Sequence, residues 1–343
     1  MSRHQPSELQ DIENTVDCRE RMHLAVEAFN RAMESEDYET AREISEYVIG
    51  SGLPNRLFGT GFQLHCLNWL AHYYRTAYAE SQDGSAEEQA AFHGLMNSLW
   101  RFKWVVANLP YDAVASREDI ERANRDIREW YAHFKISPES VEKALTEQSI
   151  TMGDAQAAQK HYSLWQQSEA DGNSDCAACK QNTLILYHHF TGDYAQVLEL
   201  ARPILNGKLG CTEVPHITYP HIIDAQIRLG HTQEAEALLH EAAALITASH
   251  PDNIRLMPFL ILAAERLGKR SHAIDWLEEY GSEIIRFGVN NRLYYLYYLM
   301  CCIPYNEDAL TAAQEVAQQF DGRNGNSYYQ DMLALQFEKA AIH

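Results

Sequence analysis

The segment from Ile222 to Ile246 reads IIDAQIRLGHTQEAEALLHEAAALI, and it decides the fold class. Gly230 ends one helical pattern and precedes another, as expected where the residue after a helix takes a left-handed conformation. Apolar residues then recur at the spacing of one helix face. They are Leu238, Leu239, Ala242, Leu245 and Ile246. The segment therefore predicts two helices joined by a tight turn.

The same turn recurs along the chain. Its copies are Met152-Gly153-Asp154, Thr191-Gly192-Asp193, Leu229-Gly230-His231 and Leu267-Gly268-Lys269, with glycines 39, 38 and 38 residues apart. A small or apolar residue follows each glycine by five positions: Ala158, Val197, Ala235 and Ala273. An earlier copy begins at Glu36-Asp37-Tyr38 and continues with Ala41, Ile44 and Val48. This regular spacing predicts a tandem array of helical hairpins.

These repeats resemble the tetratricopeptide repeat (TPR) family. The likeness rests on the Gly192-Asp193-Tyr194 and Glu36-Asp37-Tyr38 turns and on Ala41, Ala158, Ala235 and Ala273. The resemblance implies an all-α fold, a right-handed superhelical solenoid of TPR-like hairpins whose concave surface holds peptides or partner helices. Two features depart from the family. The usual period is about 34 residues, and isoleucines (Ile185, Ile223 and Ile261) replace the glycine usual in each first helix. We therefore expect each helix to be about half a turn longer than usual.

The repeats divide the chain into four parts. A polar segment is expected over residues 1–17, divergent helical repeats over 18–150, TPR-like repeats over 151–285 and capping helices over 286–343. In the divergent part, the pattern predicts helices over 57–78, 87–106, 117–134 and 138–149, with Ser85 capping the second. Three capping helices follow residue 290, the last with an apolar tail at Ala340–Ile342, and residues 293–302 are apolar enough to be buried.

Charge and composition restrict the partners. The formal net charge of −20 repels nucleic acid and suits a basic partner, although an acidic surface also simply aids solubility. No secretory signal is recognised at the N-terminus, and no apolar run approaches the roughly 20 residues that span a bilayer. The seven cysteines are unevenly spaced, unlike a disulfide framework. We expect a cytoplasmic protein that binds neither membranes nor nucleic acid.

One group of residues suggests a metal site. Cys176 and Cys179 form a C-x-x-C motif at the start of one repeat, and Cys211 and His216 lead into the equivalent helix of the next. Because first helices of successive repeats lie side by side, these four side chains are expected to converge. Three thiolates and an imidazole are a common ligand set for structural zinc. The site would then link two repeats, with His221 as a substitute ligand.

Two other interpretations of this group remain. The cysteines are small core residues with a capping histidine, or the C-x-x-C motif is redox-active, although the βαβ context usual for that motif is missing. The other four cysteines, Cys18, Cys66, Cys301 and Cys302, lack metal-like spacing and are expected in the core. No common catalytic or phosphate-binding motif is present, so we expect a protein without enzymatic activity.

Aromatic and basic residues concentrate in the divergent middle of the chain. Tryptophan and arginine are enriched at binding hot spots, although tryptophans at helical spacing usually belong to a core. The candidate partner-binding residues are Asn68, Trp69, Asn97, Trp100, Arg101, Trp104, Arg125 and Arg128. By analogy with peptide-binding members of the TPR family, Asn68, Asn97 and Arg101 are candidates to hold a peptide backbone or carboxylate.

The sequence thus favours an interaction module that binds a protein or peptide partner. Two versions remain: an immunity-like or regulatory protein that blocks a basic partner, and a peptide receptor like those of bacterial quorum sensing. Two other classes also remain. A helical enzyme using the Cys/His metal would lose turnover when those ligands are mutated, and a structural subunit would self-associate through its apolar C-terminal helices.

Overall fold

The computed structural model describes residues 7–50 and 57–338, and within these ranges the chain is all-helical, with no strand. The helices of the first half are α1 (Ser7–Asn14), α2 (Cys18–Glu34), α3 (Tyr38–Ile49), α5 (Thr60–Glu80), α6 (Ala86–Asn108), η1 (Leu109–Tyr111), α7 (Arg117–His133), α8 (Glu139–Thr151) and α9 (Ala155–Gln167). Those of the second half are α10 (Ala177–Phe190), α11 (Tyr194–Leu205), α12 (Tyr219–Arg228), α13 (Thr232–Ala248), η2 (Pro251–Leu256), α14 (Met257–Arg266), α15 (Arg270–Gly288), α16 (Arg292–Cys302), α17 (Glu307–Asn324) and α18 (Tyr328–Glu338).

The four predicted turn glycines all adopt the left-handed conformation. Their φ angles are +69° at Gly153, +79° at Gly192, +78° at Gly230 and +72° at Gly268. Glu36, which replaces glycine in the early copy of the turn, has a φ of +59°. A positive φ at these positions lets the chain reverse within a few residues. The turn pattern in the sequence is therefore confirmed.

Side-chain caps then start the helices that follow several of these turns. Asp37, Asp154 and Asp193 each accept a hydrogen bond from a backbone N–H in the first turn of α3, α9 and α11. Ser85 caps α6 in the same way, as predicted. His231 and Lys269, at the equivalent positions before α13 and α15, make no side-chain cap.

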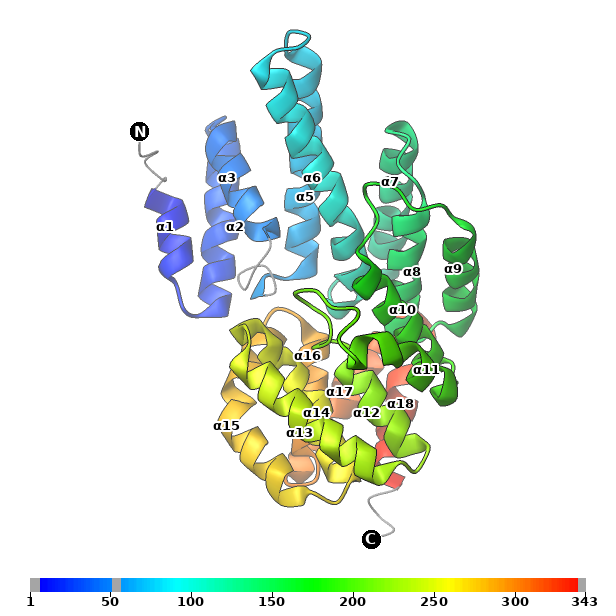
Figure 1. Ribbon diagram of the computed structural model, residues 1–343. Helices are drawn as coiled ribbons and strands as arrows, with labels where there is room; N and C mark the ends of the chain where they lie inside the picture. The colour runs from blue at the N-terminus through cyan, green and yellow to red at the C-terminus, as the bar shows by residue number, and fades with distance from the viewer. Residues whose placement is uncertain (1–6, 51–56, 339–343) are drawn as a thin grey trace.

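Each turn joins two packed helices, giving the pairs α8–α9, α10–α11, α12–α13 and α14–α15. The first helices of successive pairs also touch, α8 with α10, α10 with α12 and α12 with α14 (Figure 1). The small or apolar residues five positions after the turn glycines are fully buried: Ala158, Val197, Ala235 and Ala273. Ala41, Ile44 and Val48 are equally buried in the early copy. These residues allow the helices of a pair to approach closely.

The extra length of the repeat is not shared equally between its helices. The first helices α12 and α14 have only 10 residues, whereas the second helices α13 and α15 have 17 and 19. The expectation that each helix gains about half a turn is therefore wrong. In short first helices, Ile223 and Ile261 occupy fully buried core positions, so they add apolar contact without adding length.

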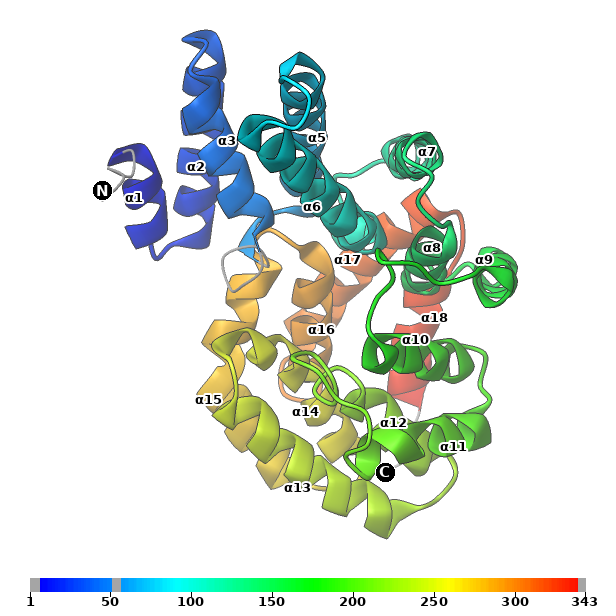
Figure 2. The same ribbon diagram turned by 45° about the horizontal axis from the view of Figure 1, so that its top comes forward.

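The C-terminal helices pack against the first half of the chain. Asn290 donates from Nδ2 to the carbonyl oxygens of Cys18 and Leu57, at 3.1 and 2.6 Å. Arg323 of α17 donates to the carbonyl oxygens of Pro110 and Asp112 beside η1. Figures 1 and 2 show α16, α17 and α18 beneath the helices of the first half. These contacts tie the end of the chain to its beginning, an arrangement that spacing alone did not predict.

The ends of the chain follow the predicted divisions only in part. Within the polar segment 1–17, residues from Ser7 form α1, whose Leu9 and Ile12 are buried. The three helices expected after residue 290 are confirmed as α16, α17 and α18, and their tail at Ala340–Ile342 lies outside the described residues. None of the helices that the structure describes is both long and apolar enough to cross a bilayer.

Candidate metal centre and candidate partner surface

The start of α10 presents two of the predicted metal ligands together. Cys176 is the N-cap residue of this helix, and its Sγ accepts a hydrogen bond from the backbone N–H of Cys179 at 3.5 Å. Residues three apart lie on one side of a helix, so the two sulfurs face the same region. Cys176 is exposed and Cys179 is half-buried.

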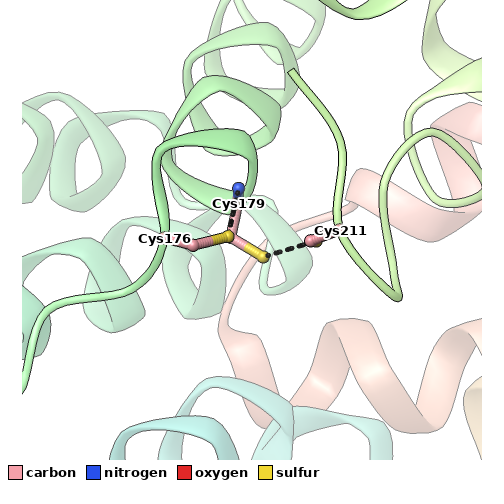
Figure 3. Close-up of side chains that lie close together, drawn as sticks. All are labelled: Cys176, Cys179 and Cys211. Carbon is pink, nitrogen blue, oxygen red and sulfur yellow. Dashed lines mark hydrogen bonds between the residues drawn. The ribbon is translucent and has the colours of Figure 1, made fainter. Parts of the chain in front are cut away.

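Cys211 brings the third sulfur from the loop between α11 and α12. The backbone N–H of Cys211 donates to the carbonyl oxygen of Val214 at 3.0 Å, which holds the loop in a closed turn. The sulfurs of Cys179 and Cys211 lie 3.6 Å apart, and all three sulfurs lie within 4.8 Å of one another (Figure 3). A tetrahedral zinc ion with Zn–S bonds of about 2.3 Å separates its sulfurs by roughly 3.8 Å. The spacing therefore suits a metal ion.

The electrostatics of the three thiols also favour a cation. Burial opposes ionisation of Cys176, but hydrogen bonds to its sulfur from Cys179, Cys211 and Ala178 outweigh burial and lower the pKa of Cys176. Burial raises the pKa of Cys179, and its two sulfur neighbours raise it further. Thiolates this close would repel one another, and a bound cation would compensate their charge.

His216 does not join the three cysteines, which corrects the predicted four-ligand set. None of the histidines or carboxylates in the described part of the chain belongs to this sulfur cluster. Both ring nitrogens of His216 are buried, and neither has a hydrogen-bond partner among the described residues. Burial lowers the pKa of His216, and Glu213 offsets this effect only in part. His216 lies in a tight turn in which the N–H of Thr218 donates to the carbonyl oxygen of Pro215. The C-x4-H spacing therefore does not bring a ring nitrogen of His216 within 4.8 Å of all three sulfurs.

His221, the substitute ligand, lies elsewhere in the repeat core. Its ring packs against that of His189 with centroids 5.1 Å apart, and His189 pairs with Asp224 at 2.8 Å. Burial, with a smaller effect of His189, lowers the pKa of His221 to about 3. The structure thus supplies three sulfur ligands and neither predicted nitrogen ligand.

A buried ionic network positions the start of α10. Asp175, next to Cys176, pairs with Lys103 of α6 at 2.8 Å and with Lys143 of α8 at 2.9 Å. All three side chains are at most 6% exposed. The network continues through Glu147, which pairs with Lys143 at 2.7 Å. It anchors the segment before the cysteines to two earlier helices.

Two of the predicted partner-binding residues, Trp100 and Trp104, are half-buried and contact the ionic network. The rings of Trp100 and Trp104 lie 4.1 Å apart, the ammonium of Lys103 lies over both, and the indole N–H of Trp104 donates to Asp175. These two tryptophans therefore cover the ionic network. The other predicted residues are spread over α5 and α7: Trp69 contacts Phe29 and Tyr73, Arg128 pairs with Glu142, Asn68 is half-buried and Arg125 is exposed.

Asn97 and Arg101 do come together, on one side of α6. They line a cavity of about 100 Å³ with Glu46 of α3 and Tyr74 of α5. Arg101 donates to the carbonyl oxygen of Ile49 at 2.6 Å and to Oδ1 of Asn97 at 3.4 Å. Burial lowers the pKa of Arg101, with a partial offset from Glu46. The wall of the cavity thus holds the amide of Asn97, the guanidinium of Arg101, the carboxylate of Glu46 and the hydroxyl of Tyr74.

A second hollow lies at the tip of the α5–α6 hairpin, and its residues were missed in the sequence. It has a volume of about 340 Å³ and is lined by Tyr78, Glu88, Gln89, Phe92 and His93. The rings of Tyr78 and Phe92 lie 5.7 Å apart, and these side chains are 36% and 40% exposed. For Phe92, the hydrophobic pattern of the sequence does indicate an exposed position.

Phe92 falls outside the apolar stripe of α6 that is buried. That stripe runs through Ala91, Leu95, Leu99 and Phe102, at helical spacing. Phe92 directly follows Ala91 in sequence, so it lies beside the buried stripe. An aromatic residue at such a position faces solvent or a partner.

No model of a known protein family matches the sequence, and no curated protein matches it significantly. The resemblance to TPR repeats therefore stays a prediction. What the structure adds is two clusters, the three cysteines at α10 and the polar and aromatic face of the α5–α6 hairpin, each with its own geometry.

Proposed function

We propose that this protein is a TPR-like, right-handed helical-repeat module that binds a partner protein or peptide, with a zinc ion linking two of its hairpins. The observation that supports binding is a pair of hollows lined by residues of the α5–α6 hairpin. On α6, His93, Asn97 and Arg101 are spaced four residues apart and share one side of the helix. On α5, Tyr74 and Tyr78 have the same spacing, and these five residues line the two hollows.

The chemistry of this face defines the segment it would take. Tyr78 and Phe92 offer exposed apolar surface for an aliphatic or aromatic side chain, and aromatic residues dominate binding hot spots. Asn97 and Arg101 supply donors for a backbone carbonyl or a carboxylate. The hairpin tip projects beyond the neighbouring helices, so a partner can reach it (Figure 1).

The net charge of −20 favours a partner that is basic overall. This face suits either version of the interaction: the protein could block a basic partner, or it could be a receptor for a peptide. We further propose that the protein acts in the cytoplasm, where its free cysteines stay reduced, and binds neither nucleic acid nor membranes.

Two variants of the hairpin test the proposed binding face. Phe92→Ala and Arg101→Glu should each weaken partner capture by about tenfold or more, because truncating a hot spot costs about 1.4 kcal/mol or more. Capture from extracts of the producing cells, quantified by mass spectrometry, is the measurement.

Matched controls separate binding from folding. Leu164→Ala removes an apolar side chain of similar exposure, 38%, from α9, and Arg122→Glu reverses an exposed charge on α7. Both controls should capture the partner normally, and all four variants should keep the far-ultraviolet circular dichroism of the parent. Normal capture by both hairpin variants would remove this face from consideration.

The three cysteines support a structural role for the proposed zinc. Cys176 and Cys179 belong to the hairpin α10–α11, whereas Cys211 belongs to the loop that leads into α12. A metal ion bound to all three fastens the start of one hairpin to the start of the next. Because the unfolded chain does not hold the three sulfurs together, metal binding stabilises the folded state.

Cys179→Ser tests this link. The variant should release one equivalent of zinc and lose about 3 kcal/mol of stability where free zinc exceeds the dissociation constant about 100-fold. Elemental analysis and thermal unfolding measure both effects. Cys302→Ser, which also alters a half-buried free cysteine, should keep the metal. A parent protein without metal, together with normal melting of Cys179→Ser, would refute the zinc link.

One observation favours a second candidate function, the helical enzyme. Structural zinc sites are usually closed by four protein ligands, whereas catalytic sites have three and an open position. The cluster at α10 supplies three. An enzyme would lose turnover in Cys176→Ser without losing stability, whereas the structural role predicts the opposite result.

A further inference from the structure

The three-sulfur cluster has a property that a closed zinc site lacks. Zinc in proteins takes four ligands, and structural sites supply all four from side chains. Within residues 7–50 and 57–338, the one group of three or more possible ligand residues at metal-binding distance consists of Cys176, Cys179 and Cys211, without a fourth member. His216, the residue best placed in sequence to complete the set, belongs to a separate turn.

The cluster also lies at the surface. Cys176 and Cys211 are both exposed, and Cys179 is half-buried beneath them. The two exposed cysteines come from different segments, the start of α10 and the loop between α11 and α12 (Figure 3). A small molecule therefore reaches a metal bound there without any opening of the fold.

We infer that a zinc ion held by Cys176, Cys179 and Cys211 has one coordination position open to solvent, and that this position takes the thiolate of a small-molecule thiol. The inference rests on the zinc link proposed above and deepens it. Sulfur is the expected donor because Zn²⁺ is a borderline-soft ion that thiolates bind at about 2.3 Å. In this exchange the thiol would give its proton to the buffer, its sulfur would bind the metal, and the water molecule from the open position would leave.

Cobalt substitution of the full-length protein makes this position visible. Co²⁺ replaces Zn²⁺ in tetrahedral sites, and its sulfur-to-metal charge-transfer absorption grows with the number of bound sulfurs. Titration with 2-mercaptoethanol should raise this absorption by roughly one third, as three sulfur ligands become four, and should saturate at one thiol per cobalt. A separate titration with imidazole tests whether the position binds a nitrogen donor instead. A response to imidazole alone would show a nitrogen-selective position and overturn the assignment to thiols.

The variant His216→Ala decides whether the protein itself closes the site. If the position is open, this variant keeps the cobalt spectrum of the parent and its response to thiol. Suppose that added thiol leaves the cobalt spectrum of the parent unchanged and that the spectrum of His216→Ala differs from it. This result would overturn the inference while leaving the zinc link intact. Failure of the parent to bind cobalt at all would refute the zinc link and the open position together. Cys302→Ser serves as the cysteine control and should behave as the parent.

Discussion

Asp175→Asn should lower the free energy of unfolding by about 3–5 kcal/mol, the range found when one partner of a buried ion pair is removed. The carboxylate of Asp175 pairs with both Lys103 and Lys143, and asparagine keeps its shape but not its charge. The ammonium groups of Lys103 and Lys143 would then lie in a buried site with less negative charge to balance theirs. Urea-induced unfolding, followed by circular dichroism, measures the loss.

The same carboxylate makes stability depend on pH. Burial opposes its ionisation, but Lys143 and Lys103 outweigh burial and lower the pKa of Asp175 from 3.8 to about 2. A group whose pKa is lowered by folding stabilises the native state above its unfolded pKa. The contribution of Asp175 is therefore complete above pH 3.8 and disappears as the pH falls toward 2. Asp175→Asn should flatten this part of the stability profile.

Asp193→Asn is the matched control for this prediction. Asp193 is an exposed cap of α11, and asparagine caps helices about as well as aspartate. The control should change stability by less than about 0.5 kcal/mol. Equal effects of the two substitutions would show that the buried network does not hold the start of α10.

Gly153→Ala should cost about 2–4 kcal/mol, from two additive causes. Gly153 has a φ of +69°, a conformation that costs alanine about 1 kcal/mol. An added Cβ would also lie 2.3 Å from the Cβ of Tyr328 in α18, and overpacking of this kind costs about 1–3 kcal/mol. The repeat turn and the C-terminal helix must separate to make room.

Gly192→Ala isolates the backbone cause. Gly192 has a φ of +79° at the equivalent turn, but a Cβ added there would meet no other part of the described chain within 4 Å. This variant should lose only about 1 kcal/mol. Thermal unfolding of both variants gives the difference. Equal losses would mean that α18 does not pack on the α8–α9 turn as described.

The repeat could be predicted from the sequence because its signals are local. Gly153, Gly192, Gly230 and Gly268 must adopt a positive φ, and that requirement is visible residue by residue. The caps at Ser85 and Asp193 are equally local. The return of α16, α17 and α18 against the first half depends on contacts such as Asn290 with Cys18, between residues far apart in sequence.

In the candidate metal centre, too, the features that depend on local sequence were predicted and those that depend on the loop conformation were not. The C-x-x-C motif at a helix start placed Cys176 and Cys179 correctly, because both belong to one helical turn. Cys211 was placed correctly by the repeat register. The position of His216 depends on the course of the loop between α11 and α12, which spacing does not reveal.

The candidate partner surface was predicted less completely. Trp100 and Trp104 were predicted as hot-spot residues from their types alone. The hydrogen bond from Trp104 to Asp175, far away in sequence, could not be predicted from spacing. Tyr78 was missed because its exposure follows from the projection of the hairpin tip beyond its neighbours. Phe92 could have been found, because it lies outside the buried stripe of α6.

Site-specific photo-crosslinking tests the proposed binding face most directly. A photoreactive phenylalanine analogue placed at position 92 or 97, in the full-length protein in its own cells, should form an adduct with one and the same partner protein. The analogue at position 164, on α9, should not form that adduct. Absence of an adduct at both hairpin positions, or the same adduct at position 164, would contradict binding through the α5–α6 hairpin.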